Sequence, residues 1–204
     1  MEKIGLQLKW ELEVKDKNGK TLIRKTGISR SLLRNFMYWL QSKFQINILA
    51  TQSTWTAPDT TNTSRTFASG AGLVEGYFGY FGAASNLSTK GLRIGILNTA
   101  VNPTDFELAS LINHGASAGQ MVYGTQSYEA VTVVGQTTSF RISRPFTNNS
   151  GNTITIKEIG AVFGEGDTGS VERFLLYLRD VLPASVAVPD GSTFTLRYTF
   201  SVTA

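Results

Sequence analysis

Alternation of apolar and polar residues is the strongest pattern in this 204-residue chain. It is clearest near the C-terminal end, where every second residue is apolar: Phe194, Leu196, Tyr198, Phe200 and Val202. A period of two is typical of a β-strand with one buried and one solvated face. The pattern predicts three consecutive closing strands, at residues 153–163, 172–181 and 192–203, with glycine-containing turns between them.

The N-terminal region predicts a β-hairpin followed by the one substantial helix of the chain. We expect hairpin strands at residues 6–14 and 21–26 and a helix at residues 31–44. Asn18-Gly19 supplies the residue types that a tight hairpin turn favours, and Ser29 or Ser31 is suited to cap the helix. Tyr38 and Trp39 lie partly off the apolar stripe of that helix. They either pack on the sheet or meet a neighbouring subunit.

The middle of the chain is less regular. It predicts strands at residues 92–97, 121–134 and 139–146 and one or two helical turns at residues 104–112. Residues 48–64 are rich in Thr, Ser and Asn, which favours a long loop or an arm that orders on a neighbouring chain. Residues 70–82 alternate glycine with bulky side chains, a pattern that fits an exposed aromatic patch and a packed irregular strand equally well.

About nine short strands against one helix indicate an all-β protein, an antiparallel β-sandwich with a jelly roll as the first topology to consider. A parallel α/β fold would need a helix after most strands, and those helices are missing from the pattern. At this length, with 41% hydrophobic residues, one domain over residues 1–204 is expected. The hairpin and helix occupy its residues 4–45, and the extended loop or arm its residues 48–64.

Composition narrows the possible chemistry. The chain has no cysteine, which excludes disulfides, thiolate nucleophiles and cysteine-ligated metals. The net charge is only +4. Basic residues gather in the first quarter, which favours a solvated face over a patch for nucleic acid or an acidic partner: Lys15, Lys17, Lys20, Arg24, Lys25, Arg30, Arg34 and Lys43. Neither a signal-peptide pattern nor an apolar run of membrane-spanning length is visible, so no membrane association is expected.

Candidate reactive residues are few. His114 is the only histidine, and without a nucleophile motif we expect a loop residue there. Glu165 and Asp167 could supply oxygens to calcium, but the aspartate spacing of a calcium loop is missing, which favours a metal-free hairpin turn. A glycosidase needs two carboxylates that converge in a cleft, and the sequence alone does not exclude Glu75, Glu129 or Glu158 from that role. We expect Glu158 to point into solvent at a β-bulge.

Several segments resemble virion structural proteins of tailed bacteriophages. In the C-terminal half these are residues 139–148 (SFRISRPFTN), 151–160 (GNTITIKEIG), 178–182 (LRDVL) and 188–200 (VPDGSTFTLRYTF). At the start of the chain they are residues 13–20 (EVKDKNGK) and 31–36 (SLLRNF). The resemblance covers about two thirds of the chain. It implies a β-rich, non-enzymatic particle component that works as a homo-oligomer, and it carries no active site.

The leading hypothesis is therefore a minor capsid or decoration protein in the virion that contacts copies of itself and other virion proteins. A tail, collar or fibre component is the nearest alternative. A carbohydrate- or receptor-binding module comes next, and an enzyme on a jelly-roll scaffold third. No cofactor or metal is expected, and direct nucleic-acid contact is not favoured. The interface candidates are large aromatic residues: Tyr38, Trp39, Trp55, Tyr77, Phe78, Tyr80 and Phe81.

Overall fold

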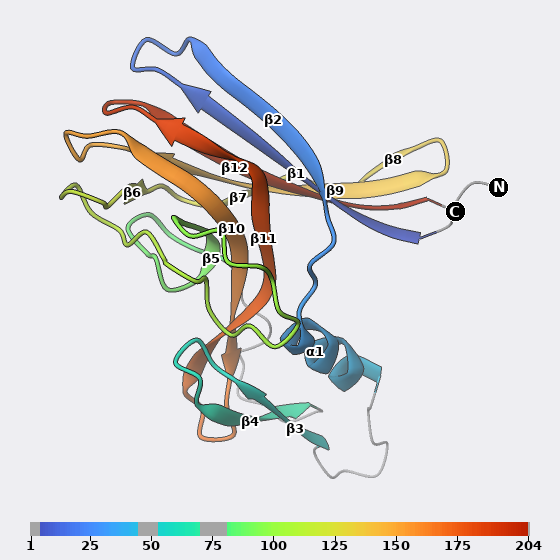
Figure 1. Cartoon of the computed structure of the whole chain (residues 1–204). Helices are drawn as coiled ribbons and strands as arrows, with labels where there is room; N and C mark the ends of the chain where they lie inside the picture. The colour runs from blue at the N-terminus through green and yellow to red at the C-terminus, as the bar shows by residue number, and fades with distance from the viewer. Residues whose placement is uncertain (1–4, 45–52, 70–80, 204) are drawn as a thin grey trace.

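Residues 5–44, 53–69 and 81–203 are described by the computed structural model (Figure 1). This part of the chain is all-β, with antiparallel sheets and one short helix. Its elements are β1 (Gly5–Lys15), β2 (Thr21–Ser29), α1 (Arg34–Phe44), β3 (Ser53–Pro58), β4 (Ser64–Ser69), β5 (Gly91–Gly95), β6 (Val122–Tyr123), β7 (Ser127–Tyr128), β8 (Thr132–Val134), β9 (Thr137–Thr147), β10 (Ile154–Gly166), β11 (Glu172–Val188) and β12 (Thr193–Thr203).

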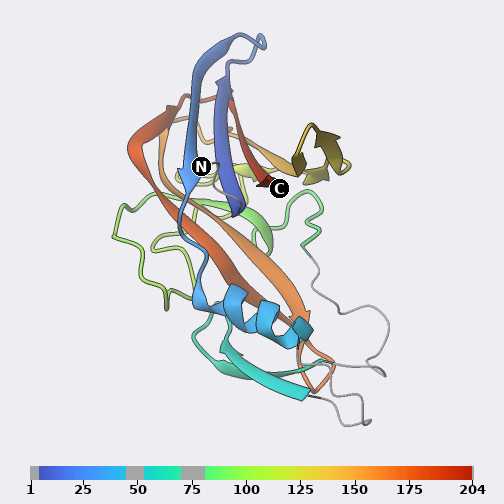
Figure 2. The same ribbon diagram turned by 90° about the vertical axis from the view of Figure 1, so that its right-hand side faces the viewer.

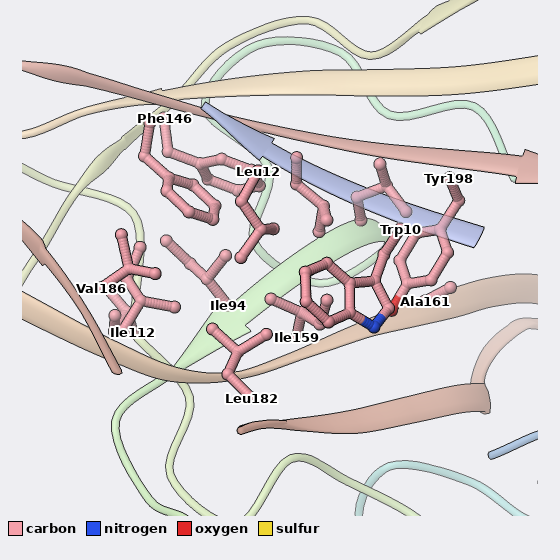
Figure 3. Packing of buried hydrophobic residues seen from close by; sticks show 14 of the residues in the cluster. Trp10, Leu12, Ile94, Ile112, Phe146, Ile159, Ala161, Leu182, Val186 and Tyr198 are labelled. Carbon is pink, nitrogen blue, oxygen red and sulfur yellow. The ribbon is translucent and has the colours of Figure 1, made fainter. Parts of the chain in front are cut away.

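Two sheets enclose the main core. The larger sheet has the order β2-β1-β12-β9, and the short strands β6, β7 and β8 all pair with the far side of β9. The smaller sheet has the order β11-β10-β5. Apolar side chains from the two sheets interdigitate, among them Trp10, Leu12 and Tyr198 from the larger sheet and Ile94 and Ile159 from the smaller (Figure 3). This arrangement is sandwich-like, and the jelly-roll topology stays a prediction.

The β10–β11 hairpin extends past the sandwich and supports a second packing centre. There α1 and the β3–β4 hairpin lie beside the far ends of β10 and β11 (Figures 1 and 2). Ala57 and Phe67 of the β3–β4 hairpin are buried against Leu175 and Tyr177 of β11. These contacts join the helix and both hairpins into one apolar cluster.

The prediction of a loop or arm at residues 48–64 was wrong for the described part of that range. Residues from Ser53 form β3 and the turn into β4, with Trp55 stacked on Phe67 at 4.5 Å. Threonine alternates with Trp55 and Ala57 here, so the segment is a short strand whose apolar face is narrow. Residues 48–52 lie outside the described residues.

Two helical expectations also need correction. The helix begins at Arg34, and neither Ser29 nor Ser31 caps it, because residues 31–33 run in extended form along β11, with the Leu33 N–H donating to the Tyr177 carbonyl (2.9 Å). Residues 104–112 form turns and bridges and no helix. Their acidic side chains bind arginines of the smaller sheet. Asp105 and Glu107 also accept hydrogen bonds from the backbone N–H groups of Asn102 and Leu108, and such local bonds compete with helix formation.

Three hairpin turns share the same pattern of hydrogen bonds to an aspartate side chain. In each, one carboxylate oxygen accepts hydrogen bonds from the backbone N–H groups two and four residues further on, at Asp16, Asp59 and Asp167. The residue three positions after the aspartate has a positive φ in every case. Such local hydrogen bonds favour turns over regular structure. The predicted hairpin at Asn18-Gly19 is confirmed and belongs to this set.

Candidate functional site

The inner face of the larger sheet continues past the smaller sheet. Three rows of paired residues cross that face: Trp10, Tyr198, Ile142 and Tyr128; then Leu8, Phe200 and Phe140; then Leu6, Val202, Thr138 and Val133. The first row is largely buried, and exposure increases toward the last. Figure 1 shows this end of β1, β9 and β12 projecting beyond β10 and β11, beside both termini. We call it the sheet overhang, comprising residues 5–8, 131–140 and 200–203.

A groove of about 530 Å³ separates the overhang from α1 and the smaller sheet. Its overhang wall includes Leu6, Phe140, Phe200 and Val202, and its opposite wall includes Phe36, Trp39, Phe81, Phe163 and Tyr177. Among the described residues that line it, none carries a charge, and the few polar ones are serine, threonine and tyrosine. This apolar groove is therefore suited to an apolar occupant and offers no charged group for a substrate.

Aromatic rings are stacked on both walls of the apolar groove. Phe81 stacks on Phe163 at 4.1 Å between ring centroids, and Phe163 stacks on Tyr177 at 4.4 Å. On the overhang, Phe140 and Phe200 are parallel neighbours at 4.8 Å. Aromatic stacks of this kind hold their side chains in place. A partner would meet a surface that loses little side-chain freedom on binding.

The β8–β9 hairpin forms the outer end of the overhang. Val131, Val133 and Val134 are exposed by 66%, 69% and 77% of their surface. Val133 lies opposite Thr138, so its side chain is on the groove side of the sheet. A contiguous apolar surface of this kind is unusual on a monomeric protein and marks interaction sites.

The charged groups that sequence reasoning considered for chemistry have structural partners. Glu158 lies at a break in the β10–β11 register, but the extra residues there belong to β11, and the expectation that Glu158 points into solvent was wrong, because its side chain is fully buried. One oxygen accepts hydrogen bonds from Arg179 Nε (2.8 Å) and the Ala109 N–H (3.1 Å), and the other accepts from the Ser110 N–H (2.8 Å). The carboxylate holds residues 109 and 110 against the smaller sheet, and its partner Arg179 binds the carbonyls of residues 99 and 100.

Two more acids complete this buried cluster. Arg179 also binds Asp105 Oδ2 at 2.7 Å, and Arg93 binds Glu107 Oε2 at 2.8 Å. Burial raises the pKa of Glu107, while the charge of Arg93 opposes that rise. The cluster therefore uses its charges to hold a loop in place, away from the apolar groove.

The remaining reactive candidates are similarly occupied. His114 Nδ1 accepts a hydrogen bond from the Tyr123 N–H at 3.2 Å, which makes it a loop residue with a structural contact. Glu129 pairs with Arg141 at the surface, and Glu165 accepts a hydrogen bond from the Tyr177 hydroxyl. Within the described ranges, no group of three or more His, Asp or Glu side chains could hold a metal ion. Glu75 lies outside these ranges.

Two of the basic residues in the first quarter, Arg24 and Lys25, have partners within the chain. Arg24 and Arg197 both bind Glu13, in an ion-pair ladder on the outer face of the larger sheet. Burial alone would raise the pKa of Glu13, but hydrogen bonds from Arg197 and Thr21 lower it overall. Lys25 donates to the carbonyls of residues 184 and 185. These contacts give Arg24 and Lys25 structural roles on that face.

The predicted interface aromatics separate into three groups. Trp39 and Phe81 line the apolar groove, whereas Tyr38 and Trp55 pack on the second apolar cluster of the same chain. The other three lie outside the described residues: Tyr77, Phe78 and Tyr80. Sequence reasoning missed the overhang itself. The available signal was the strict alternation that continues through Phe200 and Val202 to the end of β12.

Comparisons with protein-family models, with curated proteins and with solved structures find no match. Among the described residues, no helix is long and apolar enough to cross a membrane.

Proposed function

We propose that this chain is a non-enzymatic virion structural protein of a tailed bacteriophage that assembles through its sheet overhang. The observation that carries the proposal is the apolar inner face that continues past the smaller sheet and stays exposed in the single chain. Exposed apolar surface in water is unfavourable, and a lasting binding partner removes that cost. The resemblance of both ends of the chain to phage virion proteins supports the same assignment.

Within the virion, a minor capsid or decoration role is the leading form of the proposal. A decoration protein is held by many identical weak contacts, so an apolar groove of modest size is sufficient when many copies bind together. Tail, collar or fibre location is the alternative. In either position the partners are copies of this chain and other virion proteins, and a jelly-roll topology would suit both.

Electron microscopy with mass measurement tests this function. Purified protein is examined by negative staining and by light scattering, and phage particles from a producing culture are analysed by mass spectrometry. We expect defined oligomers in the first two measurements and peptides of this chain in the particles. A stable monomer that binds glycans on an array, together with particles that lack the chain, would refute the proposal in favour of a carbohydrate-binding module.

A further inference from the structure

The arrangement of the overhang leads us to infer a specific partner for the groove: a second copy of this chain. We infer that the β8–β9 hairpin of each copy packs in the apolar groove of the other, so that two chains meet reciprocally at their overhangs. This inference rests on the proposed assembly function and specifies the contact through which two copies first associate.

Hairpin and groove are chemically matched. The hairpin presents exposed valines, and the described residues that line the groove are uncharged and mainly aromatic or aliphatic. An occupant with charges would bury them without a partner, which is costly. A nucleic acid or an acidic peptide is therefore a poor fit, and the valine-rich hairpin is a good one.

Their positions also allow a two-fold contact. Val131 and Tyr128 line the groove themselves, while Val133 lies one row further out on the same face. Groove and hairpin are thus adjacent on one surface. A two-fold axis through that surface places each hairpin over the groove of the other copy, as an isologous interface requires.

The exposed area is sufficient for such a contact. Six side chains of the overhang and the adjoining groove are each exposed by between 37% and 69%: Leu6, Tyr128, Val131, Val133, Phe140 and Val202. Together they offer roughly 600 Å² per copy, which reaches the lower limit of stable, specific interfaces at about 1,200 Å² in total. Partly buried neighbours on the opposite wall, such as Trp39, add to that area.

Charge substitutions on the two matched features test the inference. Val133→Asp places a carboxylate on the hairpin, and Leu6→Asp places one on the groove wall. Val171→Asp is the control, because Val171 is an exposed residue (46%) in the distant β10–β11 turn. Sedimentation velocity over about 1–100 µM gives the dimer Kd, and urea melts confirm that each variant is folded.

We expect wild type and Val171→Asp to dimerise with the same Kd, and Val133→Asp and Leu6→Asp each to weaken the dimer at least tenfold. If Leu6→Asp does not fold, the hairpin variant still decides, since Val133 makes no core contact. A wild-type oligomer that Val133→Asp leaves intact would overturn this inference and leave the proposed function standing. A wild type that stays monomeric throughout would also overturn this inference, and the proposed function would then be decided by whether phage particles contain the chain.

Discussion

Replacing Arg144 with methionine should destabilise the protein far more than any surface change. Arg144 lies on the inner, apolar face of β9 and is fully buried. All of its donor nitrogens are used: Nε donates to the Gly124 carbonyl, one terminal nitrogen donates to the carbonyls of residues 90 and 92, and the other donates to those of residues 84 and 87. The guanidinium also lies 4.8 Å from the ring centre of Tyr123. One side chain thus organises two loops.

The expected loss of folding stability is a balance between the cost of burying the charge and the gain from its hydrogen bonds. Burial lowers the pKa of Arg144 to about 10 from 12.5, which corresponds to a cost of about 3 kcal/mol for keeping the charge inside. Five hydrogen bonds from a charged donor are worth on the order of 10 kcal/mol before that cost. Methionine fills part of the volume but leaves five carbonyl acceptors to find water. The two terms leave about 7 kcal/mol, and the buried methionine side chain returns about 1.5–3 kcal/mol. We therefore expect a net loss of about 4–5 kcal/mol, near the upper end for single substitutions.

Urea denaturation followed by circular dichroism measures this loss, and hydrogen exchange shows where protection is lost. Arg141→Met is the matched control, three residues earlier on the same strand, where the arginine has one exposed partner in Glu129. We expect the control to lose less than about 1 kcal/mol, and Arg144→Met to lose protection at residues 84–92. A loss below about 1.5 kcal/mol for Arg144→Met, or equal losses in the two variants, would refute the reasoning.

Three further substitutions test other parts of the fold. Glu158→Gln breaks a buried ion pair and should cost about 3–5 kcal/mol in urea melts, whereas a loss under about 1 kcal/mol would show that the carboxylate is dispensable. A Cβ on Gly27 would overlap the indole of Trp10, so Gly27→Ala should lower the thermal midpoint clearly, while Gly5→Ala, with open space around it, should not. Burial alone would raise the pKa of Asp59, but its hydrogen bonds lower it to about 2 from 3.8. The unfolded chain therefore takes up the proton first, and stability should fall by at most about 2 kcal/mol between pH 4 and pH 2. Asp59→Asn should flatten that part of the stability curve, and an unchanged acid slope would contradict the assignment.

Strand positions could be predicted because each depends on a local period of two. The β1–β2 hairpin and the three closing strands follow directly from alternation and turn residues, and all are confirmed. β11 nevertheless continues to Val188, past the predicted end at residue 181. It has three extra residues opposite residue 157 of β10, because residues 182–185 lie opposite that one residue, and pairing resumes at Val186. Alternation alone cannot predict that a strand resumes after such an interruption.

The long-range contacts were less predictable. Nothing local indicates that residues 31–33 pair with β11 and that the helix therefore begins only at Arg34. Met37, expected on the apolar stripe, is exposed, and Trp39 packs on the second apolar cluster. Glu158 and Arg144 were missed for a related reason. Each is a charged residue in the apolar phase of a strand, and only the partners brought by distant loops make burial there possible.

The sheet overhang could not be predicted from the sequence either. Alternation predicts which face of β12 is apolar, but it does not say where the covering sheet ends. That boundary depends on the register between the strands of two sheets, and it determines which apolar residues are core and which are available to a partner. Phe194 and Val202 belong to the same alternating series, yet only the former is buried.

The mass of the wild-type protein in solution tests the central claim most directly. Sedimentation equilibrium at about 100 µM should give a mass that is a multiple of the 22.2 kDa chain, and Val133→Asp should return it toward that of one chain. A wild-type mass of 22.2 kDa at that concentration would contradict assembly through the overhang.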